Sequence, residues 1–97
     1  MSIRIHYVKQ LEDGSLEVMI RGNHADADYV SRRLEMETGV MIGEPKQKEG
    51  MDGFVYLLIH GTPSYPFTRE RAIQMLNEDQ DIKVVDDVKP VYPDKDV

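Results

Sequence analysis

Hydrophobic and polar residues alternate over the first part of the chain in the manner of two β-strands. Residues 2–8 alternate cleanly, and residues 16–20 alternate less regularly. The Asp13-Gly14 pair between them supplies the positive φ that a tight hairpin turn needs. The pattern therefore predicts a β-hairpin. A regular first strand has two faces, one with Ile3, Ile5 and Tyr7 and the other with Arg4, His6 and Val8.

Two later segments have apolar residues at helical spacing. The first covers residues 24–38, between a favourable N-cap, Asn23, and a terminating glycine, Gly39. The second follows Thr68, which suits an N-cap. The stripes expected to be buried are Ala27, Val30 and Leu34 in the first helix and Ala72, Ile73 and Leu76 in the second. These patterns predict two amphipathic helices.

Three further apolar runs indicate strands. Residues 40–42 form a short run, although the pattern leaves open whether 40–44 is a strand. Residues 54–59 are apolar on both faces and are expected in the middle of a sheet, while 82–85 suit an exposed edge. The polar segment 44–53 is expected to be a mobile loop. Together the elements predict an α+β, two-layer sandwich in the order ββαββαβ, with a mixed sheet and two helices on one face.

The length of 97 residues fits one domain, expected over residues 1–89, followed by a flexible acidic tail over 90–97. There is no cysteine, which excludes disulfides, thiolate zinc sites and cysteine nucleophiles. No apolar run approaches the length of about 18 residues that a membrane span needs. We therefore expect a cytoplasmic protein without a membrane interaction.

The formal net charge of −6 argues against direct binding to nucleic acid. The acidity is concentrated near the C-terminus, where residues 78–97 hold seven acidic and three basic residues. This distribution indicates either a solvated terminus or an acidic face that binds a basic partner.

The best candidate site lies between the strand at 54–59 and the second helix. A Gly- and Pro-containing loop leads there into a helix start, where backbone N–H groups can bind anions. Two arginines occupy the first helical turn, in which acidic residues are normally preferred. The candidate ligand-binding residues are His60, Gly61, Thr62, Ser64, Thr68, Arg69 and Arg71.

Two functions remain open from the sequence. The first is a non-enzymatic, protein-binding adaptor or inhibitor with an acidic C-terminal face and a partner that is itself basic. The second is a binder, or a modest enzyme, for a small anionic ligand such as a nucleotide at residues 60–71. No catalytic residue, metal ligand or cofactor is expected, because the three histidines and four serines match no known spacing. An apolar second sheet face favours a homodimer.

Overall fold

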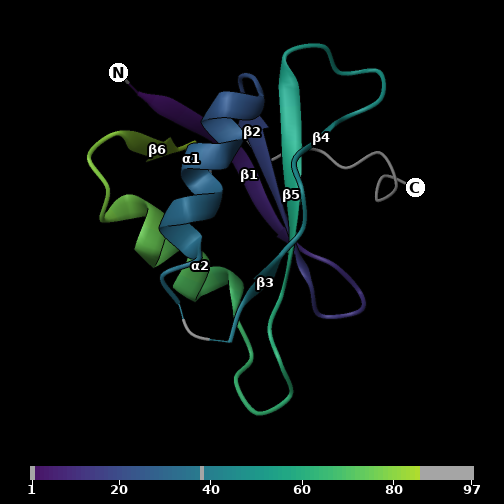
Figure 1. Ribbon diagram of the computed structural model, residues 1–97, viewed down its shortest axis with the longest axis vertical. Helices are drawn as coiled ribbons and strands as arrows, with labels where there is room; N and C mark the ends of the chain where they lie inside the picture. Colours follow the sequence, from purple (N-terminus) through teal and green to yellow (C-terminus); the bar gives the residue numbers. More distant parts are fainter. Residues whose placement is uncertain (1, 38, 86–97) are drawn as a thin grey trace.

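The computed structural model describes residues 2–37 and 39–85, which form one mixed sheet with two helices on one side (Figure 1). The strands are β1 (Ile3–Gln10), β2 (Leu16–Arg21), β3 (Met41–Ile42), β4 (Lys46–Gln47), β5 (Phe54–His60) and β6 (Ile82–Val84), and the helices are α1 (His24–Leu34) and α2 (Arg69–Asn77). The predicted α+β fold is confirmed, with one additional short strand, β4. The predicted tail lies outside the described residues.

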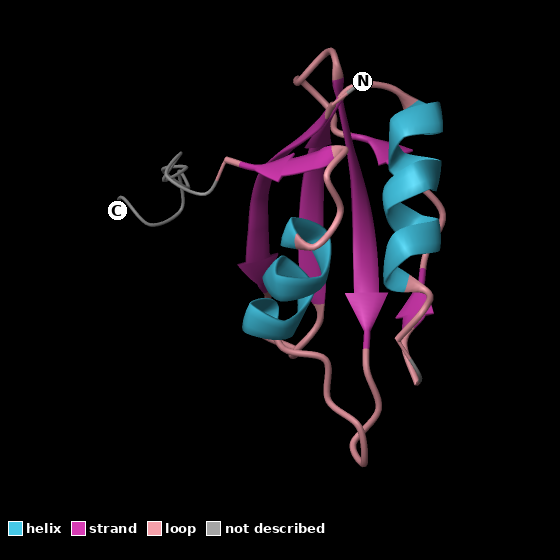
Figure 2. Ribbon diagram, turned by 90° about the vertical axis from the view of Figure 1, so that its left-hand side faces the viewer, coloured by secondary structure: helices cyan, strands magenta, loops and turns pink. Residues whose placement is uncertain are grey.

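The strand order is β3-β5-β2-β1-β6, and β4 also pairs with β5. The pairs β1–β2, β2–β5, β3–β5 and β4–β5 are antiparallel, whereas β1 and β6 are parallel. Figure 2, turned by 90°, shows the helices beside the same side of the sheet. Among the described residues, helices therefore cover one face of the sheet only, and we call the other side the helix-free face.

The core lies between the sheet and the helices. Side chains that are directly opposite on neighbouring strands share a face of the sheet, so the pairing register defines rows across it. The buried members of the helix-facing rows are apolar: Ile5, Ile20 and Val55 in one, Val8, Val18 and Leu57 in the next, and Leu16 and Ile59 in the third. Two exposed glutamines, Gln47 and Gln10, end the first and third rows. The helices contribute the predicted Ala27, Val30, Leu34, Ala72 and Leu76, together with Met75. Ile73, also expected in the buried stripe, is only partly buried and packs against this core.

A β-bulge in β1 changes the faces that the sequence predicted. Ile5 pairs with Ile20 and Tyr7 with Met19, so His6 has no opposite residue on β2. Beyond this extra residue, the alternation of side chains is reversed. Val8 is buried in the core and Tyr7 lies on the helix-free face, the opposite of the expected arrangement. Val8 therefore does not contribute to an apolar second face.

Two other boundaries differ from expectation. Helix α1 ends at Leu34 rather than at residue 38, and the turn that follows brings Glu37 to Arg71 of α2. The segment expected to be a loop over 44–53 contains β4, because the outer edge of β5 has backbone groups that this short polar strand can pair with. The helix starts agree with prediction: Asn23 forms a capping box with Asp26, and Thr68 accepts a hydrogen bond from the Arg71 N–H.

Candidate functional site

A pocket of about 380 Å³ lies at the end of β5, where the β1–β2 turn meets the loop before α2. It contains four of the seven predicted site residues: His60, Gly61, Thr62 and Thr68. The β1–β2 turn adds Asp13, whose carboxylate accepts hydrogen bonds from the Ser15 N–H and hydroxyl at 2.9 and 2.6 Å. These bonds are the main cause of a lowered pKa for Asp13. The pocket thus holds a carboxylate that remains ionised at neutral pH.

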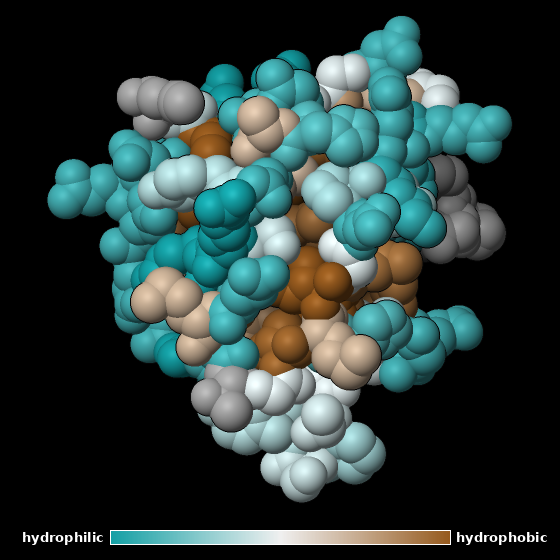
Figure 3. Space-filling view, viewed as in Figure 1, coloured by the Kyte–Doolittle hydropathy of each residue, from teal (hydrophilic) through white to brown (hydrophobic). Residues whose placement is uncertain are grey.

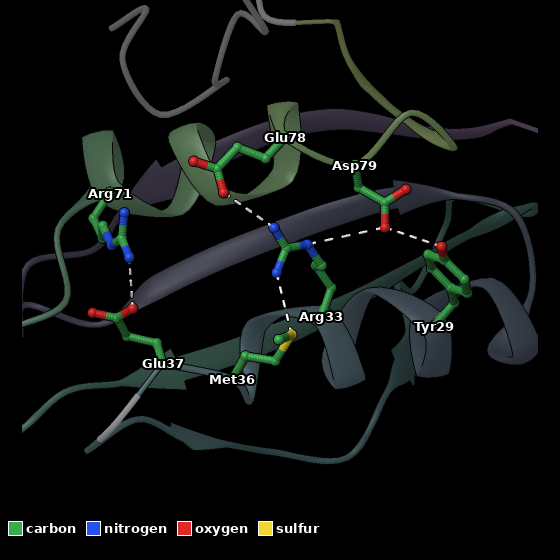
Figure 4. Close-up of polar contacts among 7 residues, drawn as sticks. All are labelled: Tyr29, Arg33, Met36, Glu37, Arg71, Glu78 and Asp79. Atoms are coloured by element: carbon green, nitrogen blue, oxygen red, sulfur yellow. Dashed lines mark hydrogen bonds and ion pairs between the residues drawn. The ribbon is translucent and has the colours of Figure 1, made fainter.

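The other three predicted residues lie outside the pocket lining. Ser64 is exposed in the tight turn that the backbone of Thr62 and Tyr65 closes. The Nε of Arg69 donates a hydrogen bond to the Val8 carbonyl oxygen at 2.6 Å, which ties α2 to β1. Arg71 Nη2 donates to Glu37 Oε1 at 3.0 Å (Figure 4). Neither guanidinium is therefore placed to hold an anion in this pocket.

Gly61 permits a close backbone approach, but the approaching group belongs to the protein itself. A Cβ at this position would lie 2.6 Å from the Phe67 nitrogen and 2.9 Å from the Tyr65 carbonyl oxygen. The missing side chain therefore lets the loop fold back on itself before α2 begins.

Polar contacts join the two helices on the opposite side from the helix-free face (Figure 4). Arg33 of α1 contacts Glu78 at 3.2 Å and lies 4.0 Å from Asp79, and the Tyr29 hydroxyl donates to Asp79 at 3.0 Å. Hydrogen bonds from Arg71 and Tyr65 lower the pKa of Glu37. Figure 3 shows this helix-bearing side as largely hydrophilic, with apolar surface where β3 and β5 run beside the helices.

The helix-free face has a different composition. Its rows follow from the same register: Lys83, Arg4, Arg21 and Phe54 in the first, Tyr7, Met19, Tyr56 and Lys46 in the second, and Lys9, Glu17 and Leu58 in the third. Lys48 follows β4 and lies above the Tyr56 ring, 5.4 Å from its centre. Six cationic residues thus share a face with one carboxylate in these rows, although the whole chain has a net charge of −6. Glu44 lies at the margin beside β5.

The single carboxylate in these rows is already engaged. Glu17 is only 7% exposed, accepts a hydrogen bond from the Tyr7 hydroxyl at 3.2 Å and pairs with Lys48 at 3.7 Å. By contrast, four exposed cations have no carboxylate partner within residues 2–37 and 39–85, namely Arg4, Arg21, Lys46 and Lys83. Among the described residues, the charges of this face that have no partner of opposite sign are therefore positive.

Aromatic rings occupy the middle of the helix-free face. Phe54 and Tyr56 lie two positions apart on β5 and are half-buried, with Tyr7 and His6 on β1. The His6 ring packs edge-on against Phe54 at 5.1 Å, and Arg21 lies 5.8 Å above the Phe54 ring. Met19 lies between Tyr7 and Tyr56 in their row and is fully buried, although no helix of the described residues covers it. The rings therefore form a continuous partly apolar surface flanked by cations.

Two hollows mark this face. One, of about 130 Å³, is lined by Arg4, His6, Arg21 and Val85, and is cationic. The other, of about 340 Å³, is lined by Tyr56 and Leu58 together with Lys46, Glu44, Gly43 and His60. Partial burial, and secondarily the charge of Arg21, lower the pKa of His6. A negative group in the first hollow would raise the His6 pKa and so counter the lowering by Arg21.

The sequence contained a signal for this face, because the rings Phe54 and Tyr56 alternate with core residues on β5. The bulge at His6 hid the same alternation in β1. The summed charge of −6 obscured the positive face, since a net charge does not report how the charges are distributed.

No protein-family model, curated protein or solved structure matches this chain. No helix among the described residues is long and apolar enough to cross a membrane. In the same part of the chain, no group of three His, Asp or Glu side chains is placed to hold a metal ion.

Proposed function

We propose that this protein is a non-enzymatic binding domain whose helix-free face binds a polyanionic chain. The observation that carries this proposal is the reversal of charge on that face. Six cations gather there in an acidic protein, and four of them lack a carboxylate partner in the described part of the chain. Clustered like charges repel one another, and a bound anion relieves this repulsion.

The sequence favoured a protein partner that binds an acidic C-terminal face. Part of that acidic segment lies outside the described residues, and two of the described carboxylates, Glu78 and Asp79, already contact Arg33. The alternative, a small anionic ligand at residues 60–71, has less support because the pocket contains Asp13 and neither Arg69 nor Arg71. The positive face therefore has the stronger support as a binding surface.

Self-association and location remain predictions. Two copies packed symmetrically through the helix-free face would bring Arg4, Arg21 and Lys46 of one copy towards those of the other, and like charges directly opposite one another oppose association. A homodimer through this face is therefore less favourable than the sequence suggested. The expected cytoplasmic location is consistent with the absence of cysteine.

The test is binding of the full chain to dextran sulfate, a polyanion without rings, measured by isothermal titration calorimetry between 50 and 200 mM salt. Arg21→Gln and Arg32→Gln are a matched pair, because each removes one exposed arginine charge, from the helix-free face and from α1 respectively. We expect Arg21→Gln to weaken binding and to reduce the salt slope, because one ionic contact and its counterion release are lost. Arg32→Gln should bind like the wild type.

No binding at 50 mM salt would contradict the proposal. Equal losses from Arg21→Gln and Arg32→Gln would also contradict it, because they would show that only the net charge matters and that no particular face is used.

A further inference from the structure

We infer that the polyanion is a single-stranded nucleic acid, with its bases stacked on Phe54 and Tyr56 and a phosphate held in the hollow lined by Arg4, His6 and Arg21. This inference rests on the proposed function, since it names the partner of the same face. It adds a role for the rings, which a purely electrostatic site does not need.

The rings are placed as a stacking surface. Phe54 and Tyr56 are adjacent on one face of β5, about 7 Å apart along the strand. Both are partly exposed, and Leu58 continues the apolar surface along β5. Base stacking on aromatic side chains tolerates any sequence, because every base has a flat π-face. Arg21 lies above the Phe54 ring and Lys48 above the Tyr56 ring, so each of two neighbouring bases stacks on its ring when the flexible cation moves from the ring to the adjacent phosphate.

The cationic hollow is next to the first ring. Arg4 and Arg21 are directly opposite on β1 and β2, and Phe54 is opposite Arg21 on β5. A phosphate between the two guanidinium groups can accept charge-assisted hydrogen bonds while its base reaches the Phe54 ring. Lys46, opposite Tyr56, supplies a cation beside the second ring. Each ring thus has a cation beside it, as alternating phosphates and bases require.

Other polyanions match this surface less well. Duplex DNA keeps its bases stacked inside, so Phe54 and Tyr56 would have no base to contact. An acidic peptide would satisfy the cations, but it has no flat groups in register with the rings. The overall charge of −6 does not prevent binding, because carboxylates such as Glu37, Glu78 and Asp79 lie beside the helices, on the other side of a molecule whose shortest dimension is 23 Å. That thickness exceeds the screening length of about 8 Å at physiological ionic strength.

The experiment compares three fluorescently labelled ligands bound by the full chain at 50 mM salt: a 12-nucleotide oligothymidylate, an abasic phosphodiester of equal length, and a duplex of the same length. Fluorescence anisotropy gives each Kd. We expect the single strand to bind about tenfold or more tightly than the abasic chain, because only the single strand can stack. The duplex should also bind more weakly than the single strand.

Variants then assign the stacking to particular rings. Tyr56→Leu and Phe54→Leu keep an apolar side chain and remove the ring, so each should reduce the preference for bases while leaving the affinity for the abasic chain unchanged. Tyr56→Trp should restore the preference and report stacking by fluorescence quenching, because the chain has no other tryptophan. Tyr65→Leu is the control, since Tyr65 is an exposed ring in the loop before α2. Circular dichroism verifies that each variant is folded.

The outcomes separate the two proposals. If the single strand and the abasic chain bind equally in the wild-type protein, the stacking inference is overturned, while binding to a general polyanion stands. The same holds if a poly-glutamate peptide binds as tightly as the single strand. If neither the oligonucleotide nor dextran sulfate binds, both proposals fail. The comparison of wild-type ligands does not depend on any variant, so a variant that fails to fold leaves the inference testable.

Discussion

Each of the four arginines in α1 and α2 contacts an acceptor, whereas four exposed cations of the helix-free face have no carboxylate partner in the part of the chain that the structure describes. The helical pairs join segments that are far apart in sequence, such as Arg33 with Glu78 and Arg71 with Glu37. On the sheet, Arg21 lies above the Phe54 ring and Lys48 above the Tyr56 ring instead. Charge thus supports the packing of the helical layer, whereas on the sheet four exposed cations keep no carboxylate partner among the described residues.

The largest effect that can test this comparison comes from packing. Leu57→Ala removes a side chain enclosed between the sheet and the helices, and we expect a loss of about 2–5 kcal/mol in the free energy of unfolding. Met19→Ala removes an equally buried side chain on the helix-free face, where water can occupy the vacated space. Its cost should be nearer the transfer free energy, about 2 kcal/mol. Urea denaturation measures both, and equal losses would mean that the helix-free face is closed as tightly as the core.

A smaller effect should separate stability from binding. Arg33→Gln removes the contacts with Glu78 and Asp79, and because the Arg33 side chain is only 20% exposed, we expect a loss of about 1 kcal/mol in stability. Arg21→Gln, at an exposed site without an ion pair in the described residues, should change stability by less than about 0.5 kcal/mol. Urea midpoints provide the measurement. If Arg21→Gln were the more destabilising of the two, the conclusion that charge stabilises the helical layer rather than the sheet would be contradicted.

The smallest effect concerns pH and His6. Burial and Arg21 lower the His6 pKa below its ordinary value of 6.5 in the folded protein, so protonation opposes folding. The neutral His6 ring therefore contributes to the free energy of unfolding above pH 6.5. This contribution is lost as the pH falls through the lower pKa that His6 has in the folded protein. Bound polyanion favours the protonated ring, so affinity should instead rise over the same range. His6→Gln should remove both trends, as measured by urea midpoints and dextran sulfate titrations at pH 5.5 and 7.5. An unchanged affinity trend in this variant would assign the effect to other groups.

Most of the fold could be predicted because its signals are local. The caps at Asn23 and Thr68 and the apolar stripes of both helices depend on residues within a few positions of each other. Strand β4 could not be predicted in this way, since two polar residues become a strand only through pairing with β5. The bulge was equally hidden, because Ile3, Ile5 and Tyr7 alternate as if the strand were regular.

The residues of the candidate site were less predictable than the fold, because long-range contacts decide which side chains lie together. The positions of Arg69 and Arg71 suggested an anion site, but their partners, Val8 and Glu37, are 61 and 34 residues away in sequence. The rings on β5 alternate visibly with core residues, yet only the placement of the helices decides which set remains accessible. The local sequence thus indicated which side chains share a face of the sheet. Only the tertiary fold determined which of the two faces the helices leave accessible.

The bulge in β1 means that this strand is one residue longer than its pairing requires. Ile20 and Met19 are consecutive on β2, whereas their partners Ile5 and Tyr7 are two positions apart, so a chain lacking His6 could form the same ladder without interruption. The surplus residue is also the one whose ring packs against Phe54 and lines the cationic hollow. The one residue that the β1–β2 ladder could lack is therefore the residue that places a titratable ring on the helix-free face.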